Sequence, residues 1–394
     1  MDSPRGRIYL IKMASEGAAE MTPNWVSHFD TCLGCMACMT ACPSGVDYGK
    51  LIESTRAQIE RRYPRKAGDK LHRRFLFETF TRPDRLQFLR WPLLAYQKSG
   101  LQKILRGLGI FRALPKSISA MEALMPRVGK QERVAAVTPA AGEKRKRVGL
   151  LLGCVQRTFL SPVNAATARV LSAEGYEVVA PEEQPCCGAL PVHAGEEESA
   201  LQLARKTIDV FEKADVEIIV TNAAGCGSNV KEYGYLLRDD PQYASRARKF
   251  AAKCKDISEI LCAAEPRAER KPLKLRVAFH DSCHLQHAQN VHAQPRALLA
   301  AIPGIELSEI PEAPICCGSA GIFNLVQPDA ANELGDRKAA LIHPLKPNVV
   351  STGNPGCLLQ LQASLARTGE PIPVVHHIQI LDASIRGVKL QGLQ

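Results

Sequence analysis

The stretch EVVAPEEQPCCGAL at residues 177–190 has a close counterpart in IELSEIPEAPICCGSAG at residues 305–321. In each copy an apolar, β-branched run leads to a Cys-Cys-Gly triplet, and a further cysteine stands on either side of the triplet. The intervals are 32 and 39 residues in the first copy and 33 and 40 residues in the second. Chance does not readily produce cysteines at such closely matched intervals. The sequence therefore predicts an internal duplication into two homologous domains, at residues 148–270 and 271–394.

Each half follows the same order of elements: strand, Cys, helix, strand, Cys-Cys-Gly, helix, strand, Cys. This alternation predicts an α/β layer fold with a mostly parallel sheet. Because residues that follow parallel strands gather at the carboxyl edge of the sheet, we expect the four sulfurs of each half to converge there, beside helix N-termini that favour thiolates. The candidate site residues are Cys154, Cys186, Cys187 and Cys226 in the first half, and Cys283, Cys316, Cys317 and Cys357 in the second.

The adjacent cysteines indicate metal binding or redox chemistry rather than a role as hydrophobic core residues. Neighbouring strand residues face opposite ways, so Cys186 and Cys187 do not readily act as two buried hydrophobic side chains. The glycine that ends each triplet suits a backbone with positive φ. We expect metal binding or redox chemistry in at least one half, with a vicinal redox disulfide or a set of structural free thiols as the alternatives. Cys254 and Cys262 lie outside the repeat and are expected to be structural.

A second motif, TCLGCMACMTACPSG, occupies residues 31–45. Its C-x2-C-x2-C-x3-C-P spacing is the bacterial ferredoxin pattern for a 4Fe–4S cluster. Short gaps and small residues let one tight loop present its thiolates to the corners of the cluster. The predicted ligands are Cys32, Cys35, Cys38 and Cys42. A zinc knuckle and a disulfide staple are the alternatives, and Cys42 either closes this cluster or serves a second one.

Residues 56–147 are strongly basic, with 23 Lys+Arg against 7 Asp+Glu, a balance of +16 in a chain whose net charge is +11. Apolar residues recur at helical spacing among the arginines, and prolines, Pro92 among them, are expected to divide the segment into short helices. Such a segment indicates either solvated helix faces or a docking surface for an acidic partner or an anionic membrane. No zinc-finger, RNA-recognition or basic-zipper signature is present, so we expect no nucleic-acid partner.

The composition, with 45% hydrophobic and 23% charged residues, is that of a globular protein. We find no apolar run long enough to span a membrane and no signal peptide, so we expect a cytoplasmic protein, in which 14 cysteines point to metal or redox chemistry rather than disulfides. The expected fold is α+β and multidomain. It comprises a small helical ferredoxin-like domain at residues 1–55, the basic helical segment at 56–147, and the two α/β cysteine-rich domains.

Several histidines accompany the cysteines. His280, His284 and His287 surround Cys283, and His193 follows the first triplet. They could tune a cluster by hydrogen bonding or relay protons, and surface or satisfied core histidines are the alternative. The sequence shows no Ser/His/Asp constellation, phosphate loop, paired-carboxylate motif or flavin or nicotinamide fingerprint. The chain is therefore expected to move electrons and to have no catalytic residues of its own.

With these motifs in view, the sequence resembles the family of iron–sulfur subunits of bacterial glycolate oxidase, and its two halves resemble the cysteine-rich domains of heterodisulfide reductase. The resemblance is carried by MDSPRGRIYL at residues 1–10, CLGCMACMTACPSGVDYG at 32–49, HDSCHLQHAQ at 280–289 and CCGSAGIFNL at 316–325. It implies at least one 4Fe–4S cluster in this chain and FAD only on partner flavoprotein subunits, which oxidise glycolate to glyoxylate. The electrons would pass toward a quinone at the inner face of the cell membrane.

The sequence departs from the family pattern in two places. The family usually carries a first cysteine motif upstream of MDSPRGRIYL, so by resemblance the chain is expected to be truncated at its N-terminus. The heterodisulfide reductase pattern ends each half in C-x-x-C, but no second cysteine follows Cys226 or Cys357 at that spacing. A four-cysteine site or a substrate pocket is thus expected, rather than a five-cysteine cluster. The alternatives are an equivalent subunit for lactate, glycerol 3-phosphate or a heterodisulfide, and a zinc or nucleic-acid-binding protein.

Overall fold

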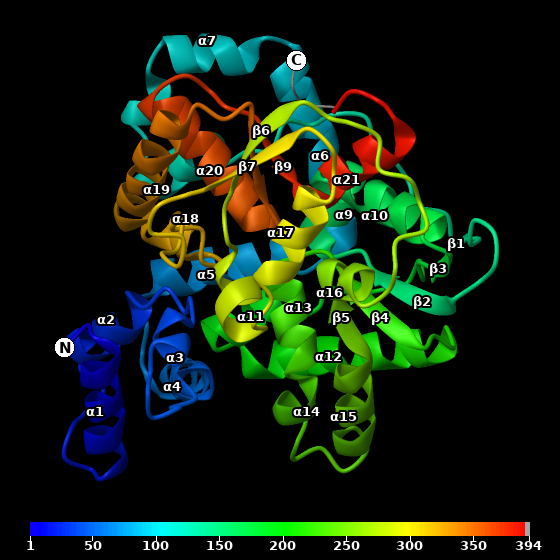
Figure 1. The fold of residues 1–394 in the computed structure, drawn as a ribbon. Helices are drawn as coiled ribbons and strands as arrows, with labels where there is room; N and C mark the ends of the chain where they lie inside the picture. The colour runs from blue at the N-terminus through cyan, green and yellow to red at the C-terminus, as the bar shows by residue number, and fades with distance from the viewer. Residues whose placement is uncertain (391–394) are drawn as a thin grey trace.

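The computed structural model describes residues 1–390, and each predicted half folds around its own sheet (Figure 1). In the first half the strand order is β1-β3-β2-β4-β5, in which β1 alone is antiparallel to its neighbour. Val148 of β2 pairs with Val178 of β3 on one side and with Ile218 of β4 on the other. The strands are β1 (Val137–Thr138), β2 (Lys146–Leu151), β3 (Tyr176–Val179), β4 (Ile218–Thr221) and β5 (Cys254–Asp256).

The second half repeats this sheet. Its order is β7-β6-β8-β9 and all its pairings are parallel. With the antiparallel edge strand β1 left aside, the first parallel strand of each half, β2 or β6, lies between the second and the third, and the fourth follows the third. The strands are β6 (Leu275–Phe279), β7 (Ile305–Glu309), β8 (Val349–Thr352) and β9 (Val374–His376). The prediction of two homologous α/β halves is confirmed.

Amphipathic helices cover the sheets. In α12, for example, Ala200, Ala204, Ile208 and Phe211 recur at helical spacing and are buried. The helices of the first half are α9 (Cys154–Phe159), α10 (Ser161–Ala173), α11 (Ala189–Ala194), α12 (Glu197–Lys213), α13 (Ala224–Lys231), α14 (Tyr233–Leu236), α15 (Ala244–Lys253) and α16 (Ile257–Cys262). Those of the second half are η2 (His284–Ala288), α17 (Ala293–Ala300), α18 (Phe323–Val326), α19 (Pro328–Ile342), η3 (His343–Leu345), α20 (Pro355–Thr368) and α21 (His377–Arg386).

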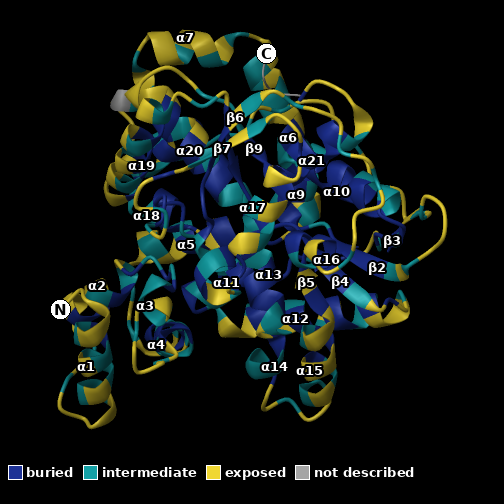
Figure 2. Ribbon diagram, in the orientation of Figure 1, coloured by how far each residue is buried: buried dark blue, intermediate teal, exposed yellow. Residues whose placement is uncertain are grey.

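One hydrophobic core runs through both halves, from Val148 and Leu150 of the first sheet to Val277 and Phe279 of the second (Figure 2). Helix α10 packs against α21, and α16 packs against α17, so each contact joins one half to the other. Truncating a buried leucine such as Leu150 to alanine typically costs about 2–5 kcal/mol. The two halves therefore share this core, and each half also has a smaller buried cluster of its own.

The ion pair between Arg169 of α10 and Asp382 of α21 reinforces the first of these contacts. The Arg169 Nη2 to Asp382 Oδ2 distance is 2.6 Å, and Arg169 Nε donates to both carboxylate oxygens. The Asp382 side chain is almost fully buried. A bidentate pair of this kind fixes the register of the two helices.

The residues before the first sheet are helical. Figure 1 shows α1 to α4 as a group beside the two halves, with the chain continuing through α5 and α6 to α7 at the top of the view. The helices are α1 (Pro4–Ser15), α2 (Pro23–Asp30), α3 (Ala37–Thr40), α4 (Tyr48–Arg62), α5 (Ala67–Phe80), α6 (Pro83–Lys98), α7 (Leu101–Gly107), η1 (Ile110–Arg112) and α8 (Lys116–Ala123). No helix within residues 1–390 combines the length and apolar character needed to cross a bilayer.

The prediction that Pro92 divides the basic segment was wrong. Pro92 lies inside α6, which runs without a break from residue 83 to residue 98. A proline in a helix interior removes one backbone hydrogen bond. Tertiary contacts hold this helix instead: Leu86 is buried in the core of the first half, and Arg90 Nη2 donates to the Gly129 carbonyl at 2.5 Å.

Candidate functional site

The four cysteines of the second half meet at the carboxyl edge of its sheet. Cys283 lies between β6 and η2, Cys316 and Cys317 lie in the loop after β7, and Cys357 lies in the first turn of α20, after β8. Cys283 hydrogen-bonds with Cys316, and Cys317 with Cys357. The fold thus gathers four thiols whose positions span 75 residues of the chain.

Hydrogen bonds make two of these thiols acidic. The hydrogen bond with Cys283 and, after it, the hydrogen bond with Cys317 are the largest effects that lower the pKa of the Cys316 thiol well below its usual value. The Gly318 amide also donates to the Cys316 sulfur, at 3.4 Å. The hydrogen bond with Cys317 likewise lowers the pKa of the Cys357 thiol. A lowered pKa favours the thiolate, which is the metal-binding form of cysteine.

Two further side chains lie beside these thiols. His280, at the end of β6, offers a ring nitrogen that lies within 4.8 Å of the sulfurs of Cys317 and Cys357, which also lie within 4.8 Å of each other. Lys338 of α19 is buried, and its ammonium donates to the Glu312 carbonyl at 2.6 Å. Burial lowers the pKa of Lys338, whereas the neighbouring thiol of Cys317 raises it. Sequence reasoning missed Lys338, because one lysine in a helix of mixed polarity carries no sign of burial.

The first half gathers its cysteines in the same way. The Cys154 thiol donates to the Cys186 sulfur at 3.4 Å, and Cys187 hydrogen-bonds with Cys226. The hydrogen bond with Cys186, together with burial, raises the pKa of Cys154. The carbonyl of Cys187 accepts from Asn229 Nδ2 at 2.7 Å and from the Tyr233 hydroxyl at 2.6 Å, which fixes the loop against the following helices.

The ferredoxin-type run forms a separate loop between α2 and α4. Positive φ at Gly34 and Met36 lets the chain turn tightly around Cys35. Burial and the neighbouring thiol of Cys316 raise the pKa of Cys35 to about 11, so the loop lies beside the second-half cysteines. The backbone amide of Val46 donates to the Cys42 sulfur and lowers the pKa of that thiol.

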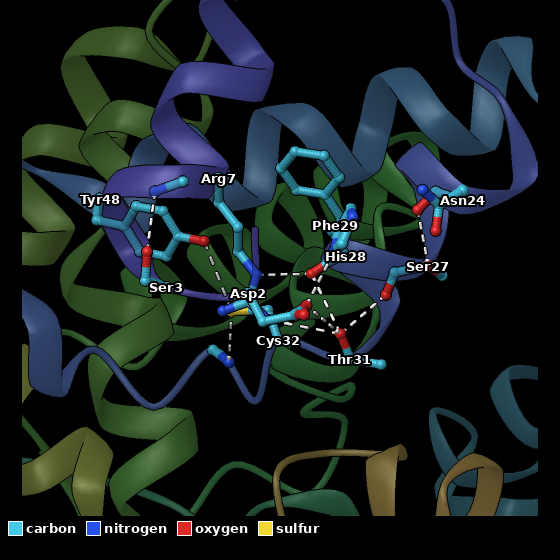
Figure 3. A network of polar contacts seen from close by, with 12 residues as sticks. Asp2, Ser3, Arg7, Asn24, Ser27, His28, Phe29, Thr31, Cys32 and Tyr48 are labelled. Carbon is cyan, nitrogen blue, oxygen red and sulfur yellow. Dashed lines mark hydrogen bonds and ion pairs between the residues drawn. The ribbon is translucent and has the colours of Figure 1, made fainter.

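The start of this loop is held by polar contacts with α1 and α4 (Figure 3). The Cys32 sulfur lies 3.5 Å from the Gly34 amide and 3.7 Å from the Tyr48 hydroxyl. Arg7 Nε donates to the His28 carbonyl at 2.6 Å, at the end of α2. These contacts set the position of Cys32, whereas Cys35, Cys38 and Cys42 remain partly accessible.

Arg56 of α4 joins the loop to the first half. Its guanidinium donates to the carbonyls of Phe29 at 3.1 Å, of Cys32, and of His193 in α11 at 2.7 Å. The three acceptors come from two parts of the chain about 160 residues apart. One arginine therefore anchors the cysteine loop on the cysteine-rich halves, a role that the sequence pattern did not reveal.

The histidines noted in the sequence lie at the same junction. His287 Nδ1 pairs with the Thr40 hydroxyl at 2.7 Å, and His284 Nδ1 with the Ser228 hydroxyl at 2.8 Å. The rings of His193 and His284 lie 4.7 Å apart and border a cavity of about 120 Å³. Burial lowers the pKa of His284 to about 3, so this imidazole is neutral at physiological pH.

The structure thus brings together every cysteine predicted to act, in three neighbouring groups. The thiols of each group are close enough to influence one another, and the ferredoxin-type loop lies beside the second half. Of the two cysteines expected to be structural, Cys254 is buried and Cys262 is exposed. None of the cysteines in residues 1–390 is in a disulfide. Groups of four thiols suit iron–sulfur or zinc binding.

Comparison with known proteins gives two family matches. The cysteine-rich domain model matches residues 148–231 and 277–362, and the model of the linker region of the glycolate oxidase iron–sulfur subunit matches residues 68–125. The "Probable glycolate oxidase iron-sulfur subunit" of Bacillus subtilis is 38% identical over 93% of this chain and 84% of its own length. The glycolate oxidase iron–sulfur subunit of Escherichia coli is 35% identical over 98% of this chain and 88% of its own length. Lactate utilization protein A of Exiguobacterium is 29% identical over 61% of this chain and 98% of its own length.

Proposed function

Because this chain belongs to the family of glycolate oxidase iron–sulfur subunits, we propose that it is the electron-transfer subunit of a flavin-dependent complex that oxidises glycolate to glyoxylate. The observation that carries the proposal is identity of 35–38% to two such subunits over more than nine-tenths of the chain. The FAD belongs to partner flavoprotein subunits, and the electrons leave toward a quinone. In this scheme the chain holds iron–sulfur clusters and leaves the substrate chemistry to its partners.

Residues 1–55 form a ferredoxin-like domain in this proposal. Cys32, Cys35, Cys38 and Cys42 hold a 4Fe–4S cluster, which supplies one-electron transfer when bound. The loop fits the group, because two of its residues have the positive φ that a tight wrap needs and backbone amides already donate to the sulfurs of Cys32 and Cys42. Helix α4 continues past residue 55 and links this domain to the basic segment at 56–147.

The domains at residues 148–270 and 271–394 supply the second tier of sites. Their thiol groups fit a metal centre, since each is rich in sulfur, has three of its four cysteines buried, and places one cysteine in the first turn of a helix. The second-half group lies beside the ferredoxin-type loop, because the thiol of Cys316 helps to raise the pKa of Cys35. The protein therefore offers a short path for electrons between the loop and the second half.

The basic segment provides a surface for the inner face of the cell membrane. Ten of the fourteen large apolar side chains that are exposed in the described residues lie between residues 71 and 118. Phe88 is 75% exposed and Trp91 is 64% exposed, and Lys98, Lys103 and Arg106 follow on α6 and α7. Figure 2 shows α7 as largely exposed. Exposed aromatic and basic side chains together suit an interface with anionic lipids.

Vesicle flotation tests this surface. The Phe88→Gln, Trp91→Gln double variant should lose most binding to vesicles that contain anionic phosphatidylglycerol, whereas Tyr9→Gln, which changes an exposed aromatic residue of α1, should keep it. Equal binding of the double variant and the unaltered chain would contradict the membrane role. Loss of flavoprotein binding with vesicle binding intact would assign the surface to the partner instead.

The relation to lactate utilization proteins favours one alternative, a subunit that serves lactate oxidation. That similarity covers 61% of this chain, against more than nine-tenths for the glycolate oxidase subunits. The cofactors expected of the chain are the same in both cases. The flavoprotein partner and its substrate therefore distinguish the two.

The decisive experiment is anaerobic reduction of the full chain with its flavoprotein partners. Glycolate should bleach the visible absorption of the clusters only when the flavoprotein is present, dithionite should bleach it in either case, and lactate should not. Cys38→Ser should remove the ferredoxin-type electron paramagnetic resonance signal, whereas Cys262→Ser, which changes an exposed thiol outside all three groups, should retain it. A colourless, iron-free chain after anaerobic reconstitution would refute the proposal, and reduction by lactate alone would replace the substrate.

A further inference from the structure

The internal duplication provides a residue-by-residue comparison of the two thiol groups. Cys154 corresponds to Cys283, so Leu151, three residues before the first, corresponds to His280. Leu151 ends β2 and His280 directly follows β6, the corresponding strand, and both side chains are buried. The four thiols are common to both halves, and the histidine is present in the second half alone.

A second buried polar residue distinguishes the halves in the same place. Ala200 and Ala331 each lie against the glycine that ends a Cys-Cys-Gly triplet, so Lys338, seven residues after Ala331, corresponds to Thr207. The ammonium of Lys338 supplies a positive charge near the second-half thiols. A site that gathers several thiolates carries negative charge, and a buried cation offsets it.

The position of His280 suits a ligand better than a structural residue. The side chain is 1% exposed, and one ring nitrogen lies within 4.8 Å of the sulfurs of Cys317 and Cys357. Its Nδ1 has no hydrogen-bond partner within residues 1–390, and its imidazole interacts with the Cys357 sulfur. An unpaired buried polar atom costs about 1–3 kcal/mol, and a leucine at this position, as in the first half, would avoid that cost. A histidine at this position is therefore explained by binding through its imidazole rather than by packing.

We propose that His280 is a nitrogen ligand of a metal centre in the second half, which it binds together with the thiolates of Cys317 and Cys357. This rests on the proposed function in one respect, that the metal is iron of an iron–sulfur cluster. Imidazole and thiolate are both good ligands for iron and zinc, and mixed ligation changes the properties of a cluster relative to thiolates alone. The first half, with Leu151 in place of the histidine, binds through sulfur only, and the two centres differ.

Pulsed electron paramagnetic resonance of the reduced, anaerobically prepared full chain tests this ligand. Protein labelled with ¹⁵N-histidine should show a nitrogen coupling that differs from that of unlabelled protein. The coupling should disappear in His280→Leu, which introduces the residue of the first half, and persist in His284→Gln, which alters a partly buried histidine next to Cys283 in the sequence. Circular dichroism should show that both variants fold.

Cobalt binding to the iron-free chain gives a readout that does not depend on the cluster. Co²⁺ should bind with the charge-transfer absorption of thiolate ligation. His280→Leu should weaken the affinity of one site by at least ~10-fold, because even the loss of an outer-shell partner of a ligand typically weakens metal binding by ~10–100-fold. Unchanged cobalt affinity in His280→Leu, or a histidine coupling that survives in it, would overturn the proposal. If iron is absent but His280→Leu still weakens cobalt binding, the proposed function fails and the His280 site stands.

Discussion

Arg56 gives the sharpest test of how the cysteine loop is positioned, and the change to make is Arg56→Met. The methionine retains the apolar stem but loses the hydrogen bonds to the carbonyls of Phe29, Cys32 and His193. A hydrogen bond from a charged donor contributes about 1.5–3 kcal/mol. Two of the bonds hold the loop itself, and water replaces part of what is lost. Local opening of the loop should therefore become easier by about 3 kcal/mol, or about 100-fold.

Amide hydrogen exchange of the anaerobic full chain measures this opening. Exchange at residues 32–42 should accelerate about 100-fold in Arg56→Met, while exchange in β6 and β8 stays as it is in the unaltered protein. Iron should also be lost faster from the loop. Arg246→Met is the matched control, because it removes an arginine from surface ion pairs on α15. If the loop exchanges at the same rate in Arg56→Met and in this control, the anchoring role of Arg56 is wrong.

Two further predictions concern stability. Burial raises the pKa of Asp256 from 3.8 to about 6, so the native state binds the extra proton and the unaltered chain should lose up to about 3 kcal/mol of stability as pH rises from about 4 to about 6. Asp256→Asn, which keeps a side-chain acceptor for the Ser258 amide, should remove this loss. Urea unfolding at several pH values measures the stability of both proteins. Equal pH dependence of the two would count against the effect. Gly318→Ala should destabilise the chain more than Gly188→Ala. Both glycines have positive φ, but the Cβ added at Gly318 would lie 2.4 Å from the Ala331 carbonyl oxygen, whereas the Cβ added at Gly188 would lie 3.5 Å from its nearest neighbour. Thermal unfolding of the two variants compares them, and equal losses would contradict the geometry.

The sequence predicted the parts of the fold that repeat. The spacing of Cys154, Cys186 and Cys226 reports loop positions at the ends of parallel strands, and such loops meet at one edge of the sheet whatever lies between them. The convergence of the thiols therefore followed from spacing alone. The spacing in the run that begins at Cys32 likewise predicted a single tight loop.

Long-range contacts could not be predicted in this way. Arg56 finds its acceptors in backbone carbonyls, which every residue possesses, so no pattern marks them. Pro92 continues a helix because tertiary packing compensates for the missing hydrogen bond, and local propensity does not include packing. The position of His280 near Cys317 and Cys357 does have a sequence signal, namely the leucine at the matching position of the other half.

The reciprocal packing of α10 on α21 and of α17 on α16 has the form of an isologous interface. In each contact a helix that follows the first strand of one half meets the helix that follows the fourth strand of the other. A symmetric homodimer makes such contacts between identical subunits, and a mutation in its gene alters both of its sites at once. Here the pseudo-twofold axis lies within one polypeptide. A substitution can change one group of cysteines and spare its twin, so tandem fusion gives the two groups the freedom to specialise.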